Sequence, residues 1–105
     1  MKGEISVFKR IKERIEANKQ ITIKKQMLED CYNYIDELSK KIASTISLID
    51  YYNTLDIQEI HKNSYQAALD RLYCRLGFLK SQEVIMWCEV KNIKDEIENL
   101  KKKKK

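Results

Sequence analysis

The sequence contains no proline, two glycines and one histidine among its 105 residues. It therefore has few of the residues that end helices or build tight turns. It has no glycine-rich loop of the kind that holds phosphate groups. No stretch approaches the ~20 consecutive apolar residues that cross a membrane. The first residues lack the continuous apolar segment of a signal peptide. We therefore expect a protein without a transmembrane segment or signal peptide.

Side chains suited to catalysis or metal binding are also scarce. Cys31, Cys74 and Cys88 are far apart, which fits neither a disulfide framework nor the ligand spacing of a metal site. His61 has no ligand-like set of cysteines or carboxylates at helical spacing, so we interpret it as a solvated or helix-capping residue. We predict a reduced, cytoplasmic protein that is not an enzyme and has no cofactor, metal or small-molecule substrate.

Charge is distributed unevenly along the chain. The formal net charge of +5 arises at the two ends. Residues 1–25 carry eight basic and three acidic side chains, residues 26–100 carry eight basic and thirteen acidic ones, and Lys101–Lys105 adds five lysines. A uniformly basic body would favour nucleic-acid binding, whereas two basic ends around an acidic middle favour it only weakly.

Apolar residues recur with the 3-4 spacing of a coiled coil in two long stretches, which we call seams. The first seam comprises Leu28, Cys31, Ile35, Leu38, Ile42, Thr45, Ile49 and Tyr52. The second comprises Leu69, Leu72, Leu76, Leu79, Glu83, Met86, Val90, Ile93, Ile97 and Leu100. Glu83 is the only charged seam residue. Because the spacing is kept across Gly77, we expect the second helix to continue through it.

The segment between the seams predicts a tight turn at residues 53–56. Asp56, with Glu59 three residues later, forms the capping-box pattern that begins a helix. Such a turn would join two antiparallel helices and place Leu38 opposite Leu72. It would also bring Glu83 within reach of Lys24 or Lys25, where we expect an ion pair.

The N-terminal residues predict a separate short helix. Its apolar face comprises Ile5, Phe8, Ile11 and Ile15, and it is out of phase with the first seam. The β-branched residues at 21–23 lower helix propensity. We therefore expect a break near residues 18–22, with Ile11 and Ile15 packing against Ile93 and Ile97.

The predicted fold is all-α. It is a long antiparallel, coiled-coil-like helical hairpin, with the short N-terminal helix completing a three-helix arrangement. A dimeric bundle is an alternative. Helices are expected at residues 4–17, 22–53 and 57–100 of a single domain, residues 1–100. A flexible lysine tail, Lys101–Lys105, would follow.

Residues 73–88 are apolar on nearly every side, and such a helix is normally covered on both faces. The residues predicted to bind a partner protein are Tyr73, Phe78, Ile85, Trp87 and Cys88. The N-terminal helix, a second copy of the chain or a different protein would cover them. We interpret the chain as a small interaction module, such as an adaptor, inhibitor or assembly factor.

Basic residues suggest an alternative function. In this interpretation the chain is a nucleic-acid-associated accessory protein that makes non-specific phosphate contacts. The residues concerned are Lys9, Arg10, Lys12, Arg14, Lys101, Lys102 and Lys103. The same amphipathic N-terminal helix is also of a type that lies on anionic membrane surfaces.

Overall fold

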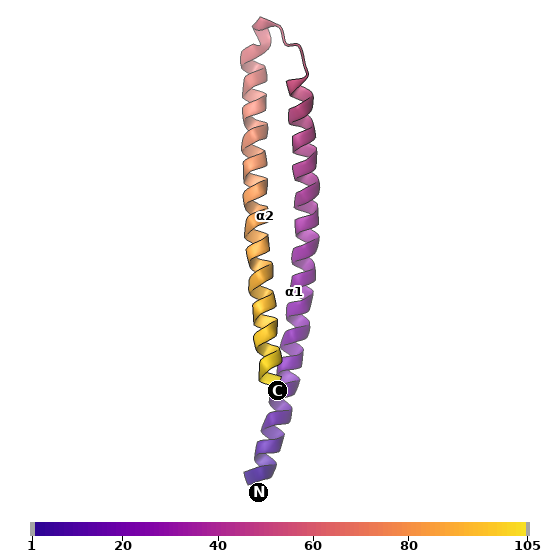
Figure 1. The fold of residues 1–105 in the computed structure, drawn as a ribbon, viewed down its shortest axis with the longest axis vertical. Coiled ribbons are helices and arrows are strands. Elements are labelled where there is room, and N and C mark those ends of the chain that lie inside the picture. Colours follow the sequence, from indigo (N-terminus) through magenta and orange to yellow (C-terminus); the bar gives the residue numbers. More distant parts are fainter. Residues whose placement is uncertain (1, 105) are drawn as a thin grey trace. The chain divides into compact units, whose positions relative to one another are not determined.

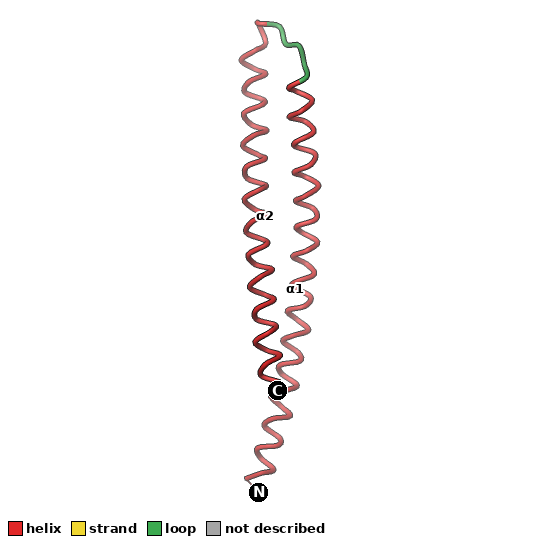
Figure 2. Tube along the Cα trace, viewed as in Figure 1, coloured by secondary structure: helices red, strands yellow, loops and turns green. Residues whose placement is uncertain are grey.

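The chain folds into two long α-helices joined by a short irregular segment (Figure 1). The computed structural model describes the backbone of residues 2–104 and the side chains of residues 6–103. Helix α1 spans Lys2–Asn53, the 3-10 helix η1 spans Glu59–His61, and α2 spans Lys62–Lys104. Figure 2 shows no strand among the described residues. The predicted all-α helical hairpin is confirmed.

The structure divides into two compact units, and each contains a segment of both helices. Unit 1 comprises residues 1–33 and 88–105, and unit 2 comprises residues 34–87. In unit 1, Lys24 Nζ lies 2.5 Å from Glu96 Oε2. In unit 2, Ser39 Oγ donates a hydrogen bond of 3.4 Å to Glu83 Oε2. These contacts place α1 against α2 within each unit.

Seam residues form most of the core of both units, as the heptad spacing predicts, and Ala17 and Ile21 add to it before the first seam. The buried apolar residues of unit 1 are Ala17, Ile21, Cys31, Val90, Ile93 and Ile97. Those of unit 2 are Ile35, Leu38, Ile49, Leu69 and Leu79. Thr45 is also buried, and its Oγ1 donates to the Lys41 carbonyl at 2.8 Å. That bond satisfies the hydroxyl without interrupting the helix.

The expected break near residues 18–22 and the separate N-terminal helix are absent, because α1 is continuous from Lys2. Thr22 lies within the continuous helix and begins no new one. Its Oγ1 donates to the Asn18 carbonyl one turn earlier, at 3.0 Å. Ile21 is buried in the seam. Burying an isoleucine side chain adds about 1.5–3 kcal/mol to the free energy of unfolding. Placing a β-branched residue in a helix lowers that free energy by only about a few tenths of a kcal/mol, so burial outweighs helix propensity.

The predicted packing of Ile11 and Ile15 against Ile93 and Ile97 is also wrong. Ile93 and Ile97 are buried, but Ile11 and Ile15 are about half exposed, at 49% and 51%. The first seam simply continues toward the N-terminus through Ile21 and Ala17, with no change of phase. The Ile5 side chain lies outside the described residues.

The connection between the helices is longer than predicted, and the expected cap is not used. Residues 54–58 are non-helical, η1 follows, and Gln58 at its N-cap makes no side-chain capping bond. Asp56 therefore does not begin a helix at residue 57, and Glu59 pairs with Lys62 at 2.8 Å instead. A residue of α2 stabilises the end of α1, because the Tyr65 hydroxyl donates a hydrogen bond to the Tyr52 carbonyl.

The longer connection changes which residues face each other. Glu83 bonds to Ser39, and Lys24 pairs with Glu96, so the predicted ion pair of Glu83 with Lys24 or Lys25 is wrong. Leu38, next to Ser39, is therefore level with Glu83 and not with Leu72. Leu72 precedes Glu83 on α2 by about 16 Å along the helix axis. A repeating apolar seam packs in several registers, and the connecting segment selects one of them.

The C-terminal half of the chain is helical further than expected. Helix α2 continues through Gly77, as predicted. It also includes Lys101 and extends to Lys104, so the expected flexible tail is helical as far as the structure describes it. Lys105 lies outside the described residues.

Candidate functional site

The residues predicted to bind a partner are all on the surface. The exposed fraction of the residue is 51% for Tyr73, 64% for Phe78, 57% for Ile85 and 48% for Trp87, and Cys88 is exposed. The seam residues of the same helix are buried or half-buried. The cause is geometric, because a single facing helix covers only one side of α2.

These residues lie on two different faces of α2. Tyr73 and Trp87 each follow a seam residue directly and flank the seam. Phe78 and Ile85 lie on the opposite side of the helix, on a surface we call the outer strip. The outer strip consists of Cys74, Gly77, Phe78, Ser81, Val84, Ile85 and Cys88, which recur at spacings of three and four residues.

The outer strip has the composition of a contact surface. None of its seven residues is charged. Val84, which sequence reasoning missed, is 62% exposed and lies three residues after Ser81 and four before Cys88, on the same side of the helix. The signal was present, since Val84 and Ile85 are consecutive apolar residues outside the seam. The strip can therefore lose water to a partner without leaving a charge buried.

The cysteines have different surroundings. All three are free, with Cys74 and Cys88 exposed and Cys31 buried. Burial raises the pKa of the Cys31 thiol, and the carboxylates of Glu89 and Asp30 raise it further. The buried thiol is therefore the less reactive kind, because the thiolate is the nucleophile.

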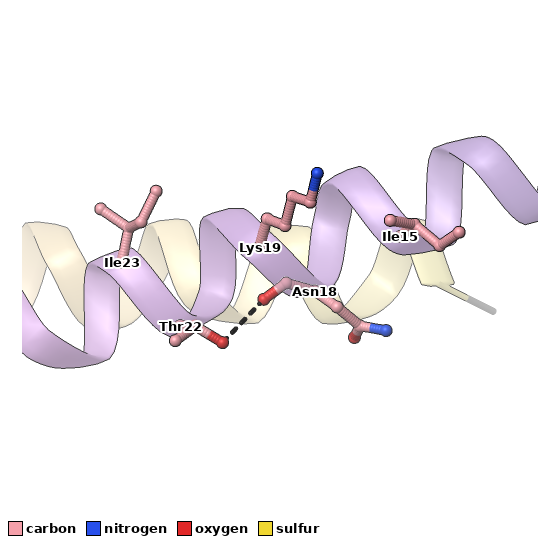
Figure 3. Close-up of a pocket in the computed structure, with 5 residues that line it drawn as sticks. All are labelled: Ile15, Asn18, Lys19, Thr22 and Ile23. Atoms are coloured by element: carbon pink, nitrogen blue, oxygen red, sulfur yellow. Dashed lines mark hydrogen bonds between the residues drawn. The ribbon is translucent and has the colours of Figure 1, made fainter.

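No metal-binding cluster is found in the part of the chain that the structure describes. It contains no group of three His, Cys, Asp or Glu side chains placed to hold a metal ion. The hollow in Figure 3 is lined by residues of α1 alone: Ile15, Asn18, Lys19, Thr22 and Ile23. Its one internal hydrogen bond joins Thr22 to the Asn18 backbone.

The predicted basic residues are exposed and belong to unit 1. Lys9, Arg10, Lys12 and Arg14 lie on α1, and Lys101–Lys103 lie near the end of α2. Leu100 and Lys103 line a hollow together with Glu13 and Glu16 of α1. The two basic segments therefore occupy the same end of unit 1, but two carboxylates lie between them.

Comparison with models of protein families, with curated protein sequences and with solved structures found no match to this chain. Among the described residues, neither helix is both long and apolar enough to span a lipid bilayer.

Proposed function

We propose that the protein is a non-enzymatic interaction module, acting as an adaptor, inhibitor or assembly factor, and that the exposed α2 surface binds another polypeptide. One observation carries the proposal: Phe78, Val84 and Ile85 are each more than half exposed on one helix. Clustered apolar side chains on a soluble protein mark interaction sites more often than isolated ones do.

The exposed apolar area of α2 can supply binding energy. Apolar surface gains about 25 cal/mol for each Å² removed from water, and aromatic residues at the centre of a contact supply much of its binding energy. Phe78 of the outer strip is such a residue, and Tyr73 and Trp87 are exposed on the adjoining face beside the seam. Nothing else in the described chain covers the strip, since α1 contains no separate short helix that folds over it.

A crosslinking experiment tests the proposal directly. A photoreactive phenylalanine analogue placed at position 78 in cells should form an adduct with another polypeptide. The same analogue at Ile60, which is 83% exposed but lies in η1, is the matched control and should form none. Changing Val84 and Ile85 to serine should abolish the adduct at position 78. Equal labelling from both positions, or none from either, would contradict the proposal.

Alanine variants distinguish a binding surface from a core. Phe78→Ala and Val84→Ala should change the free energy of unfolding by less than about 1 kcal/mol, because the side chains are exposed. Leu79 is a buried neighbour of Phe78, and Leu79→Ala should lower the free energy of unfolding by about 2–4 kcal/mol. Chemical unfolding of the dilute protein measures both. Losses at Phe78 as large as those at Leu79 would show that Phe78 belongs to a core.

One observation favours the second candidate, a nucleic-acid-associated accessory protein. The basic segments of α1 and α2 occupy the same end of unit 1. Neutralising Arg10 and Arg14, with deletion of Lys101–Lys105, should then weaken duplex binding and reduce its salt dependence. A mobility-shift assay at physiological salt measures this, and unchanged binding in the variant would reject the candidate.

A further inference from the structure

We infer that the partner of the outer strip is a second copy of this chain, bound antiparallel about a two-fold axis that passes near Ser81. This inference rests on the proposed function, because it names the occupant of the same surface. Every strip residue lies on α2, which is one continuous helix. The reasons are the symmetry of the strip and the charges beside it.

The strip has nearly the same pattern in both directions from Ser81. Cys74 and Cys88 lie seven residues away on either side, Phe78 and Val84 three, and Gly77 and Ile85 four. A two-fold axis at Ser81 therefore places apolar side chains opposite apolar ones. A Cβ added at Gly77 would meet no atom within 4 Å, so the partner's large side chains have room there. Self-complementarity of this kind is what a two-fold interface requires.

The charges beside the strip favour the antiparallel orientation. Gly77 and Val84 lie along one edge of the strip, and Phe78 and Ile85 lie along the other. Asp70 and Lys91 continue the first edge at spacings of seven residues. Arg75 and Glu89 lie beside the second edge. Rotation about Ser81 brings Asp70 close to Lys91 of the second copy and Arg75 close to its Glu89. A parallel, in-register pair would instead place each charge against itself, which is unfavourable.

These four charged residues are available for such contacts. None of them forms an ion pair within the described part of the chain, where the pairs are Lys24–Glu96, Lys40–Asp36 and Lys62–Glu59. Asp70 accepts only a hydrogen bond from Gln66, at 2.9 Å. The adjoining face through Tyr73 and Trp87 is less suitable for a two-fold contact. A two-fold axis at its centre would place Lys80 of one copy against Lys80 of the other, and the two positive charges would repel each other.

The expected dimer is reversible. The strip covers only about four helical turns, which is a small interface, so we expect a dissociation constant of about micromolar size. Light scattering over a concentration series should show the mass rising from one chain to two. Replacing both Phe78 and Ile85 with serine should leave the helix content unchanged and keep the mass at one chain.

Cysteine crosslinking tests the orientation. A short bismaleimide adds one thiol across each of its two double bonds, so it joins thiols that lie close together. In a Cys31→Ser background it should join Cys74 of one copy to Cys88 of the other. Cys74→Ser and Cys88→Ser variants should each lose the crosslink, since equivalent cysteines would be about 21 Å apart. Mixing the two variants should restore it.

Charge reversal gives an independent test. Arg75→Glu places like charges together at two symmetric positions and should weaken the dimer by about three- to tenfold. Adding Glu89→Arg in the same chain should restore the original affinity. A reversed charge at Lys62, which lies outside the strip, is the control and should have no effect. Failure of the double variant to recover would overturn the predicted charge pairing.

The outcomes separate this inference from the proposed function. A monomer at every concentration, combined with an adduct to a different protein at position 78, would overturn the dimer and leave the interaction module standing. A dimer that keeps its crosslink in Cys88→Ser would overturn the antiparallel arrangement. A monomer that forms no adduct at position 78 would overturn both.

Discussion

At the scale of single residues, the chain tolerates polar groups in its seams by giving each one a hydrogen-bond partner. Thr45 donates to the Lys41 carbonyl and is buried. Glu83 is half-buried and accepts from Ser39 of α1. Both positions follow the rule that a polar group near a core is tolerable when it has a hydrogen-bond partner. Neither polar residue interrupts its helix.

The raised pKa of Cys31 predicts that the stability of the fold depends on pH. Its thiol has a raised pKa in the folded chain, so the unfolded chain loses this proton at lower pH than the folded chain does. The resulting stability is present below the thiol's ordinary pKa of about 8.5 and falls as pH rises above it. Urea unfolding between about pH 7.5 and 10 should show a smaller decline in Cys31→Ala than in the parent chain.

The control for this measurement is Cys74→Ala, which removes an exposed thiol. It should leave the pH dependence of the parent chain unchanged. Identical pH profiles for Cys31→Ala and the parent would contradict the role given to burial of Cys31.

At the scale of the helices, burial in the seam outweighs local propensity. Helix α1 continues through the β-branched residues at 21–23, and α2 continues through Gly77. Both segments contain residues that lower intrinsic helix stability. Each also belongs to a stretch whose seam residues pack against the other helix, and that packing keeps the segment helical.

Gly77→Ala should stabilise α2. Glycine in a helix interior costs about 0.5–1 kcal/mol relative to alanine, and the added methyl group meets nothing within 4 Å. We expect the free energy of unfolding to rise by about that amount, measured by urea unfolding at concentrations where the chain is monomeric. Ser81→Ala, one turn later, is the comparison substitution, because it does not remove the conformational-entropy cost of a glycine. Equal changes in both variants would argue against the explanation.

At the scale of the whole molecule, the connection sets the register of the hairpin. Residues 54–58 and η1 separate the helices by more residues than a tight turn would. Tyr65 then bonds to the Tyr52 carbonyl, with the two rings 5.9 Å apart. Leu55 and Ile57 of the connection are half-buried, which gives the longer segment contacts of its own. The register follows from these contacts near the connection.

Hydrogen exchange should differ strongly along α1. The side chains at positions 6–12 are all exposed, whereas Ile35 and Leu38 are buried in unit 2. Amides before Glu13 should exchange at least about tenfold faster than those around Leu38, because helix ends without tertiary packing open readily. Mass spectrometry of peptides from both regions measures this. Equal protection along α1 would indicate that another surface covers the N-terminal segment.

Much of the fold and part of the candidate site could be predicted from residue spacing. The seams from Leu28 to Tyr52 and from Leu69 to Leu100 identified the core, and the apolar residues outside them identified the exposed surface. Val84 was missed, although it directly precedes Ile85 outside the second seam. The helix boundaries near Asp56 and Lys101 were wrong, because capping patterns and repeated lysines are weak signals beside tertiary contacts.

The sequence alone determined that the chain forms helices and which side of each is apolar, because a 3-4 spacing fixes a residue's direction within its own helix. Only the tertiary structure decided that α1 is unbroken, that Leu38 is level with Glu83 rather than Leu72, and that no separate N-terminal helix covers Phe78 and Ile85. These properties depend on the length of the connection and on the facing helix. A repeating pattern fits several such arrangements equally well.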